Sequence, residues 1–231
     1  MGQPHAVLTG LERLADALLA VSLAPRCASC DIPLDRPTRG CICAACWTLI
    51  TPAPGVLWIS DAISAARAGG DFDGPLRDAI HAFKYEGRRS LAAPLARLMR
   101  ASASDMLDGA DCVVPVPLHA IRYITRGFNQ AADLARRLEL PIVHALWRTR
   151  RTSSQSGLTA AGRRRNVREA FALSPLLSTA SRDARLRGRI VVLVDDVRTT
   201  GATLDACARV LRERAAVREV RAVTAAARDL R

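Results

Sequence analysis

The 231-residue sequence has no long uninterrupted apolar run. A membrane-spanning helix needs roughly 20 apolar residues. Residues 6–24 come nearest, but Glu12, Arg13 and Asp16 interrupt them. The apolar stretch of a signal peptide would be uncharged, so we predict an amphipathic helix over residues 1–24, no membrane span and a cytoplasmic protein. Four apolar side chains fall on one stripe of that helix: Leu11, Leu14, Leu18 and Val21.

Aromatic side chains and lysine are also scarce. Aromatics make up 4% of residues, which weakens a base-stacking platform for single-stranded nucleic acid. The candidates for one are Tyr85, Phe128 and the three tryptophans, and we expect most of these in the core. The net charge of +12 suits a nucleic acid or a phosphorylated small molecule. Lys84 is the only lysine among 34 basic residues, a bias that genome composition can produce.

The texture of the chain changes near residue 56. Residues 25–54 are rich in Cys, Pro and Gly and have little periodic structure. Residues 56–231 alternate strand-like and helix-like segments, which predicts an α/β domain with a mostly parallel sheet flanked by helices. We expect strands at 112–117, 189–196 and 219–227, and helices at 74–87, 90–103, 129–140 and 203–215.

Two Cys-x-x-Cys pairs stand in the segment 25–54. Four thiolates at this spacing suit a tetrahedral Zn²⁺ ion and leave no open coordination position, so we expect a structural zinc ribbon. A segment so poor in core-forming residues also needs such a crosslink to fold. The predicted metal ligands are Cys27, Cys30, Cys43 and Cys46.

Three further cysteines lie outside this set. Cys41 is an alternative ligand in place of Cys43, although the paired spacing is then lost. Cys112 and Cys207 stand in apolar strand and helix contexts, where a free thiol packs as a small apolar group.

Residues 191–203, VVLVDDVRTTGAT, place two adjacent carboxylates behind an apolar strand. Open α/β sheets bind ligands at the carboxyl ends of their strands. The Gly- and Thr-rich turn that follows offers backbone N–H groups to a phosphate. Asp195 and Asp196 suit sugar hydroxyls or, through water, Mg²⁺. A ligand with a phosphate on one side and a diol on the other is a ribose 5-phosphate.

This stretch resembles the signature of the type I phosphoribosyltransferases, which bind phosphoribosyl pyrophosphate (PRPP). The resemblance implies that family's fold, Mg²⁺ bound with PRPP, an acidic pair on the ribose hydroxyls and a loop around the 5-phosphate. Carried over to this chain, the PRPP-binding residues are Asp195, Asp196, Arg198, Thr199, Thr200, Gly201, Ala202 and Thr203.

Other segments narrow the resemblance. With the cysteine pairs, they resemble the ComF family of competence-associated, phosphoribosyltransferase-like proteins. The segment after the strand at 112–117 corresponds to a pyrophosphate-binding loop, in which Arg122 and Arg126 are candidates to pair with phosphate and Gly127 permits close backbone approach. The matching segments are FKYEG (83–87), VPVPLH (114–119), RGFNQA (126–131) and residues 153–171.

Residues 148–168 form a long, polar, arginine-rich segment. It resembles the mobile hood that closes over PRPP in type I enzymes, with Gln155, Arg165 and Asn166 as candidate ligand contacts. Its seven arginines suit a nucleic-acid backbone equally well.

Two functional hypotheses follow. In the first, the protein is a phosphoribosyltransferase acting in DNA uptake or nucleotide metabolism. In the second, it is a non-catalytic module that senses PRPP and binds single-stranded DNA, with a partner in the competence machinery. No His or Glu beside the motif marks a base for an acceptor, so the acceptor stays open. We expect Lys84 to cap the helix 74–85 at its last carbonyls, with contact to phosphate as the alternative.

Overall fold

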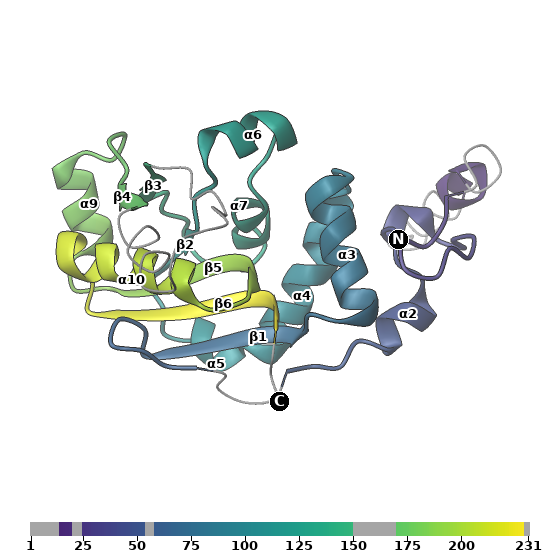
Figure 1. The fold of residues 1–231 in the computed structure, drawn as a ribbon, viewed down its shortest axis with the longest axis horizontal. Helices are drawn as coiled ribbons and strands as arrows, with labels where there is room; N and C mark the ends of the chain where they lie inside the picture. Colours follow the sequence, from purple (N-terminus) through teal and green to yellow (C-terminus); the bar gives the residue numbers. More distant parts are fainter. Residues whose placement is uncertain (1–13, 20–24, 54–57, 150–169, 229–231) are drawn as a thin grey trace, which may run out of the picture.

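The computed structural model describes residues 14–19, 25–53, 58–149 and 170–228. Its centre is a four-stranded parallel sheet in the order β1-β6-β5-β2 (Figure 1). All four strands therefore end at the same edge, which is where an open α/β sheet binds its ligand. The strands are β1 (Ala65–Asp71), β2 (Cys112–Pro115), β5 (Ile190–Arg198) and β6 (Glu219–Ala227).

Helices cover both faces of this sheet. On one face lie α3 (Gly74–Tyr85), α4 (Ala92–Ser102) and α7 (Gln130–Ala135); on the other lies α10 (Ala202–Ala215). The residues of β5 alternate between the two cores: Val192 and Val194 pack with α3 and α4, whereas Val191 and Leu193 pack with α10. A strand buried on both sides explains the unbroken apolar run in the sequence.

Shorter elements surround the sheet. β3 (Leu146–Arg148) and β4 (Phe171–Leu173) form an antiparallel pair, and α9 (Thr179–Leu186) leads back to β5. The remaining elements are η1 (Pro37–Arg39), α2 (Ala44–Thr48), η2 (Arg89–Leu91), α5 (Ser104–Leu107) and α6 (Ala120–Arg126).

The predicted strands and most predicted helices are confirmed, but the structure also adds or alters several elements. β1 was not predicted, because AARAGGD contains no β-branched or aromatic residue and becomes a strand only by pairing with β6. The helix expected at 129–140 ends at Ala135, although Asn129 caps it as its sequence suggests. Helix α6 lies where a loop was expected, and the side chain of His119 caps it.

The N-terminal unit lies at one end of the molecule beside α3 (Figure 1). Its buried cysteines join the same core as α3 and α4. Within the expected helix 1–24, the structure describes only residues 14–19, which are helical. There Asp16 is buried and accepts hydrogen bonds from Thr38 N and Oγ1, while Leu14 and Leu18 are exposed. No helix among the described residues is both long and apolar enough to span a membrane.

Candidate functional site

The acidic pair lies where β5 extends beyond its neighbour β2. The last paired residue of β2 is Pro115, opposite Val194, whereas β5 continues beside β6 as far as Arg198. Asp195 is therefore the first β5 residue without a β2 partner. The edge of the sheet is therefore uneven here, with both carboxylates beyond the last residue pair of β2 and β5.

Strand alternation explains how two adjacent carboxylates coexist. The pleat turns Asp195 toward the face covered by α10, where its charge adds to burial in raising the pKa of the Cys207 thiol. Asp196 turns toward α3, and its Oδ1 lies 2.7 Å from Lys84 Nζ. The ammonium of Lys84 thus pairs with a carboxylate rather than with the helix carbonyls that we expected. This contact between distant parts of the chain leaves no periodic signal in the sequence.

Asp195 differs from Asp196 in having no such direct cationic partner among the described residues. Burial, reinforced by the charge of Asp196, raises the pKa of Asp195 to about 7, against the smaller opposing effects of Lys84 and Arg148. The backbone N–H of Asp196 donates to Asp195 Oδ1 at 2.9 Å. Near neutral pH the pair therefore carries less negative charge than two free carboxylates would.

The raised pKa predicts that Asp195→Asn stabilises the protein more at about pH 8 than at about pH 5.5. The folded state keeps the Asp195 proton where the unfolded chain, with a pKa of 3.8, has lost it. The resulting stabilisation is complete below about pH 4 and is lost as the pH rises through 7. Asn has no charge to bury. The gain in unfolding free energy should differ by about 2 kcal/mol between the two pH values in urea titrations; equal gains would contradict the raised pKa.

The turn after β5 is shaped to admit an anion. Gly201 has a φ of 77° and precedes α10, whose first turn has no side-chain cap. The backbone N–H groups of that first turn and the helix dipole favour negative charge. Thr199 and Thr200 are exposed, and Ala202 N lies 3.4 Å from Thr200 Oγ1. Thr203 is half-buried in the first turn of the helix.

Trp58 supports this turn, a role that was not predicted from the sequence. A Cβ on Gly201 would lie 3.1 Å from Trp58 Cζ2, and the guanidinium of Arg198 stacks over the Trp58 ring at 5.2 Å. The same segment holds the helix start, because Ser60 Oγ donates to Asp205 Oδ1 at 2.5 Å. A tryptophan outside any periodic pattern carries no sequence signal for such a role.

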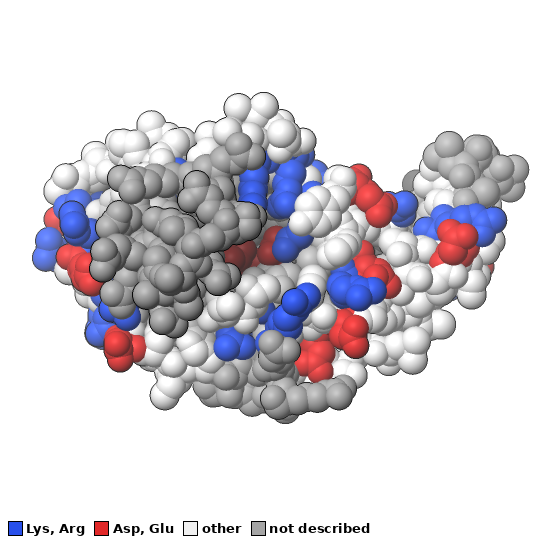
Figure 2. All heavy atoms as spheres, in the orientation of Figure 1, with Lys and Arg blue, Asp and Glu red and all other residues white. Residues whose placement is uncertain are grey.

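A basic cavity of about 550 Å³ is connected to the acidic pair through Lys84, which lines the cavity and pairs with Asp196. Arg122 and Arg126 from α6 line it together with Lys84. Figure 2 shows basic groups around a hollow between α6 and α3, with acidic atoms recessed beside them. Gly127 ends α6 with a φ of 76°, and the Arg126 guanidinium lies 5.0 Å above the Tyr85 ring. The segment predicted as a pyrophosphate loop therefore places two arginines around a cavity that Lys84, the partner of Asp196, also lines.

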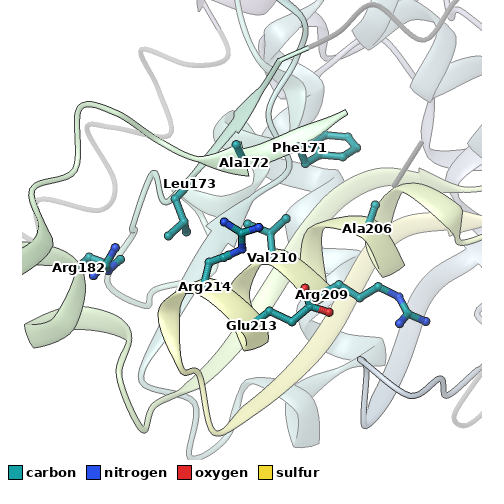
Figure 3. Close-up of a pocket in the computed structure, with 9 residues that line it drawn as sticks. All are labelled: Phe171, Ala172, Leu173, Arg182, Ala206, Arg209, Val210, Glu213 and Arg214. Atoms are coloured by element: carbon teal, nitrogen blue, oxygen red, sulfur yellow. The ribbon is translucent and has the colours of Figure 1, made fainter. Parts of the chain in front are cut away.

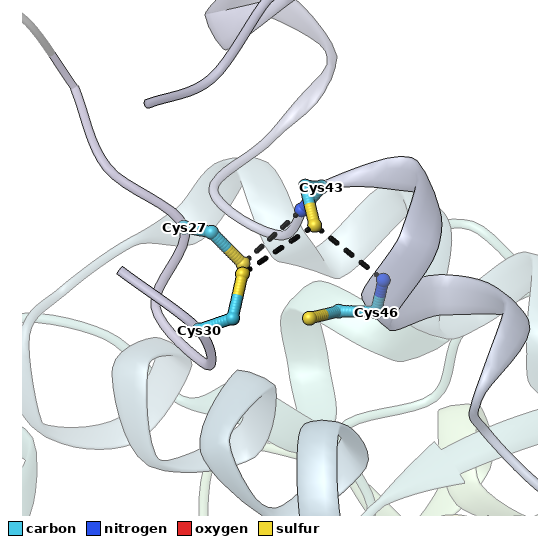
Figure 4. Close-up of side chains that lie close together, drawn as sticks. All are labelled: Cys27, Cys30, Cys43 and Cys46. Carbon is cyan, nitrogen blue, oxygen red and sulfur yellow. Dashed lines mark hydrogen bonds between the residues drawn. The ribbon is translucent and has the colours of Figure 1, made fainter. Parts of the chain in front are cut away.

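The four predicted metal ligands converge in the N-terminal unit (Figure 4). One ligand atom from each of the four cysteines lies within 4.8 Å of the others, and Cys30 Sγ lies 3.7 Å from Cys43 Sγ. Zn–S bonds of about 2.3 Å in a tetrahedron put sulfurs about 3.8 Å apart. Backbone N–H groups also support the sulfurs, with Cys43 N donating to Cys27 Sγ and Cys46 N to Cys43 Sγ. The cluster fits a metal ion such as zinc.

The other three cysteines do not join the cluster. Cys41 is buried, and desolvation raises the pKa of its thiol. Its backbone carbonyl accepts a hydrogen bond from Ala28 N at 2.7 Å, so the backbone of Cys41 lies next to the segment that carries the first cysteine pair. Cys112 and Cys207 are buried, as predicted for packing residues.

A second cavity, of about 620 Å³, lies between β4 and α10 (Figure 3). Phe171, Leu173 and Val210 supply apolar lining, and Arg214 is among the charged residues around it. Neither acidic residue of the pair lines it. The hood residues Gln155, Arg165 and Asn166 fall outside the described part of the chain.

Comparison with known proteins agrees with this geometry. Residues 124–229, which include β5, α10 and β6, match the phosphoribosyl transferase domain, so the fold is of the phosphoribosyltransferase type. "DNA utilization protein YhgH" of Salmonella typhi is 32% identical over 199 residues, covering 80% of this chain and 77% of that protein. The chain belongs to the ComF family of competence-associated, phosphoribosyltransferase-like proteins.

Two further relatives carry competence names. "Competence protein F" of Haemophilus influenzae is 34% identical over 154 residues, covering 62% of this chain and 65% of that protein. "Competence protein ComFC" of Bacillus subtilis is 29% identical over 150 residues, covering 64% of this chain and 58% of that protein. The chain thus spans less than two thirds of these two proteins, and what they do as wholes is carried over only as a proposal.

Proposed function

We propose that this protein binds PRPP, with Mg²⁺ carried on its diphosphate, at the carboxyl edge of the sheet. The observation that carries the proposal is the start of α10 at Ala202, which has no side-chain cap from Gly201 and follows the acidic pair after a short turn. Lys84, which pairs with Asp196, connects that pair to a cavity lined by three cations. In this arrangement the turn 198–203 binds the 5-phosphate, the acidic pair binds the ribose hydroxyls, and Arg122 and Arg126 bind the diphosphate. We also propose zinc as the metal of the four cysteines.

The test is a calorimetric titration of the purified protein with Mg-PRPP. Ribose 5-phosphate and pyrophosphate, each carrying half of the recognised chemistry, serve as competitors. We expect PRPP to bind and each half to displace it at higher concentration, because each occupies one part of the site. A protein that binds ribose 5-phosphate and pyrophosphate but not PRPP, or PRPP with no competition from either, contradicts the proposed arrangement.

A substitution at Gly201 should weaken PRPP binding. Gly201→Ala puts a side chain at a left-handed φ and against Trp58, so the turn must shift. Gly188→Ala is the matched control, because Gly188 has a φ of 68° and open space around its Cβ position. Both variants should lose roughly 1 kcal/mol of stability, but only Gly201→Ala should lose PRPP affinity, by about fivefold or more. Equal affinity in the two variants would contradict a role for this turn.

A role in DNA uptake is the broader proposal, supported by the competence names of the relatives. A second candidate is a PRPP-sensing module that binds single-stranded DNA. It is favoured by exposed aromatics: Tyr85, which lines the basic cavity, is 70% exposed, and Tyr123 and Trp147 elsewhere on the surface are 53% and 45% exposed. Bases stack on such rings. The expectation that most of Tyr85, Phe128 and the three tryptophans lie in the core was wrong, because only Phe128 among them is buried. Loss of oligonucleotide binding in Tyr85→Ala with PRPP binding intact would support this second function.

A further inference from the structure

Lys84 stands at the boundary between the acidic pair and the basic cavity. Its ammonium lies 2.7 Å from Asp196 Oδ1, and Lys84 is also one of the residues that line the cavity with Arg122 and Arg126. The two paired side chains are 16% and 11% exposed, so water screens their interaction little. One residue thus borders both the carboxylate and the space for an anion.

The surroundings hold this lysine in place. Phe83 is fully buried and its ring contacts that of Phe128 at 5.5 Å, which anchors the last turn of α3 next to the end of α6. Tyr85 holds the Arg126 guanidinium on the other side. The backbone of Lys84 is therefore fixed, and only its four-carbon side chain is free to reorient.

The charges around the cavity do not balance. Glu86 also lines the cavity but pairs with Arg88 at 2.8 Å. No carboxylate among the described residues forms an ion pair with Arg122 or Arg126. Of the cavity's three cations, Lys84 alone has such a partner. An anion that enters the cavity therefore meets two guanidinium groups that have no carboxylate partner among the described residues. The third cation, Lys84, is already paired with Asp196, and the negative charge of Asp196 repels the anion.

The type of residue matters as well. Lys84 is the only lysine in a chain that places arginine at its other basic positions. An ammonium is a compact charge with three rotatable donors on a flexible stem, whereas a guanidinium is a planar fork suited to one fixed geometry. A lysine can therefore turn from one anion to another without rearranging its neighbours.

We propose that Lys84 is an exchangeable counter-ion: it pairs with Asp196 in the empty protein and turns to the diphosphate of a bound ligand. This inference rests on the proposed function for the identity of the anion. The exchange releases Asp196 for the sugar hydroxyls at the moment when the diphosphate is bound. The two halves of the ligand would then favour each other's binding through one side chain.

Inorganic pyrophosphate, titrated calorimetrically, tests the exchange without the sugar. Lys84→Met should weaken pyrophosphate binding by about ten- to hundredfold, the value of one charge-assisted hydrogen bond. Asp196→Asn should tighten it about threefold or more, because the competing carboxylate is gone. A merely structural ion pair predicts instead that both variants lose affinity together, and that outcome, or unchanged binding in Lys84→Met, overturns the proposal.

Two further variants control for folding and for general charge. Lys84→Met/Asp196→Asn removes both members of the ion pair and leaves neither without its partner, so it should fold like the wild type and still bind pyrophosphate weakly. Tight binding by this variant overturns the proposal. Arg100→Gln removes a cation that pairs with Glu139 outside the cavity, so it should leave the pyrophosphate affinity unchanged. If Arg100→Gln lost as much affinity as Lys84→Met, the effect would be one of net charge, and the proposal would be overturned.

The wild type separates this inference from the proposed function. If the wild type binds pyrophosphate but not PRPP, the proposed function is contradicted and the exchange of Lys84 between anions is not. If it binds PRPP but not pyrophosphate, only the exchange is contradicted. Binding of neither overturns both.

Discussion

A Cys30→Ser variant is expected to lose the metal of the four-cysteine cluster and, with it, the folded N-terminal unit. The four sulfur atoms lie within 4.8 Å of one another, so removing one leaves three ligands for a tetrahedral ion. Structural zinc sites in small units contribute on the order of 10 kcal/mol to folding. Elemental analysis of the wild type should therefore find one zinc per chain, and the variants of Cys27, Cys30, Cys43 and Cys46 should each be depleted.

Cys41→Ser is the matched control for this prediction. Cys41 lies in the same unit and is buried, but its sulfur is not part of the cluster. The variant should keep its zinc and lose only some packing stability. If Cys41→Ser were to lose zinc while Cys43→Ser kept it, the ligand assignment would be wrong.

The second large effect is expected from Asp195→Asn/Asp196→Asn. The double variant keeps the size of both side chains but removes their charge, and charge-assisted hydrogen bonds to a ligand are worth roughly 1.5–3 kcal/mol each. PRPP affinity should therefore fall by roughly tenfold or more. Titration calorimetry of the folded variant measures this loss.

DNA binding should respond in the opposite direction. Removing negative charge from a basic protein leaves binding to a phosphate backbone unchanged or slightly tighter, with its steep salt dependence intact. An oligonucleotide titrated into the same preparation gives the comparison. An equal loss of both ligands would mean that DNA and PRPP share one site. Pyrophosphate provides a third measurement, because it lacks the ribose hydroxyls that the acidic pair is proposed to bind.

Local pattern was sufficient wherever one segment carries the physical signal. The apolar run 190–194 predicted a doubly buried strand, because only a strand between two helical layers buries every residue of such a run. Two Cys-x-x-Cys pairs predicted the metal cluster, because tetrahedral thiolate coordination requires that pairing. The residues that resemble the type I signature lie together in the order strand, turn and helix, so their placement followed from the sequence.

Only the tertiary structure decided what lies beside that motif. β1 is a strand because β6 pairs with it, not because AARAGGD favours the conformation. The partnership of Lys84 with Asp196 joins residues 112 positions apart (196 − 84). Trp58 supports Gly201 from a similarly distant segment. Periodicity and spacing describe neighbours along the chain, whereas the charge balance and shape of this site depend on contacts that exist only after the sheet has assembled.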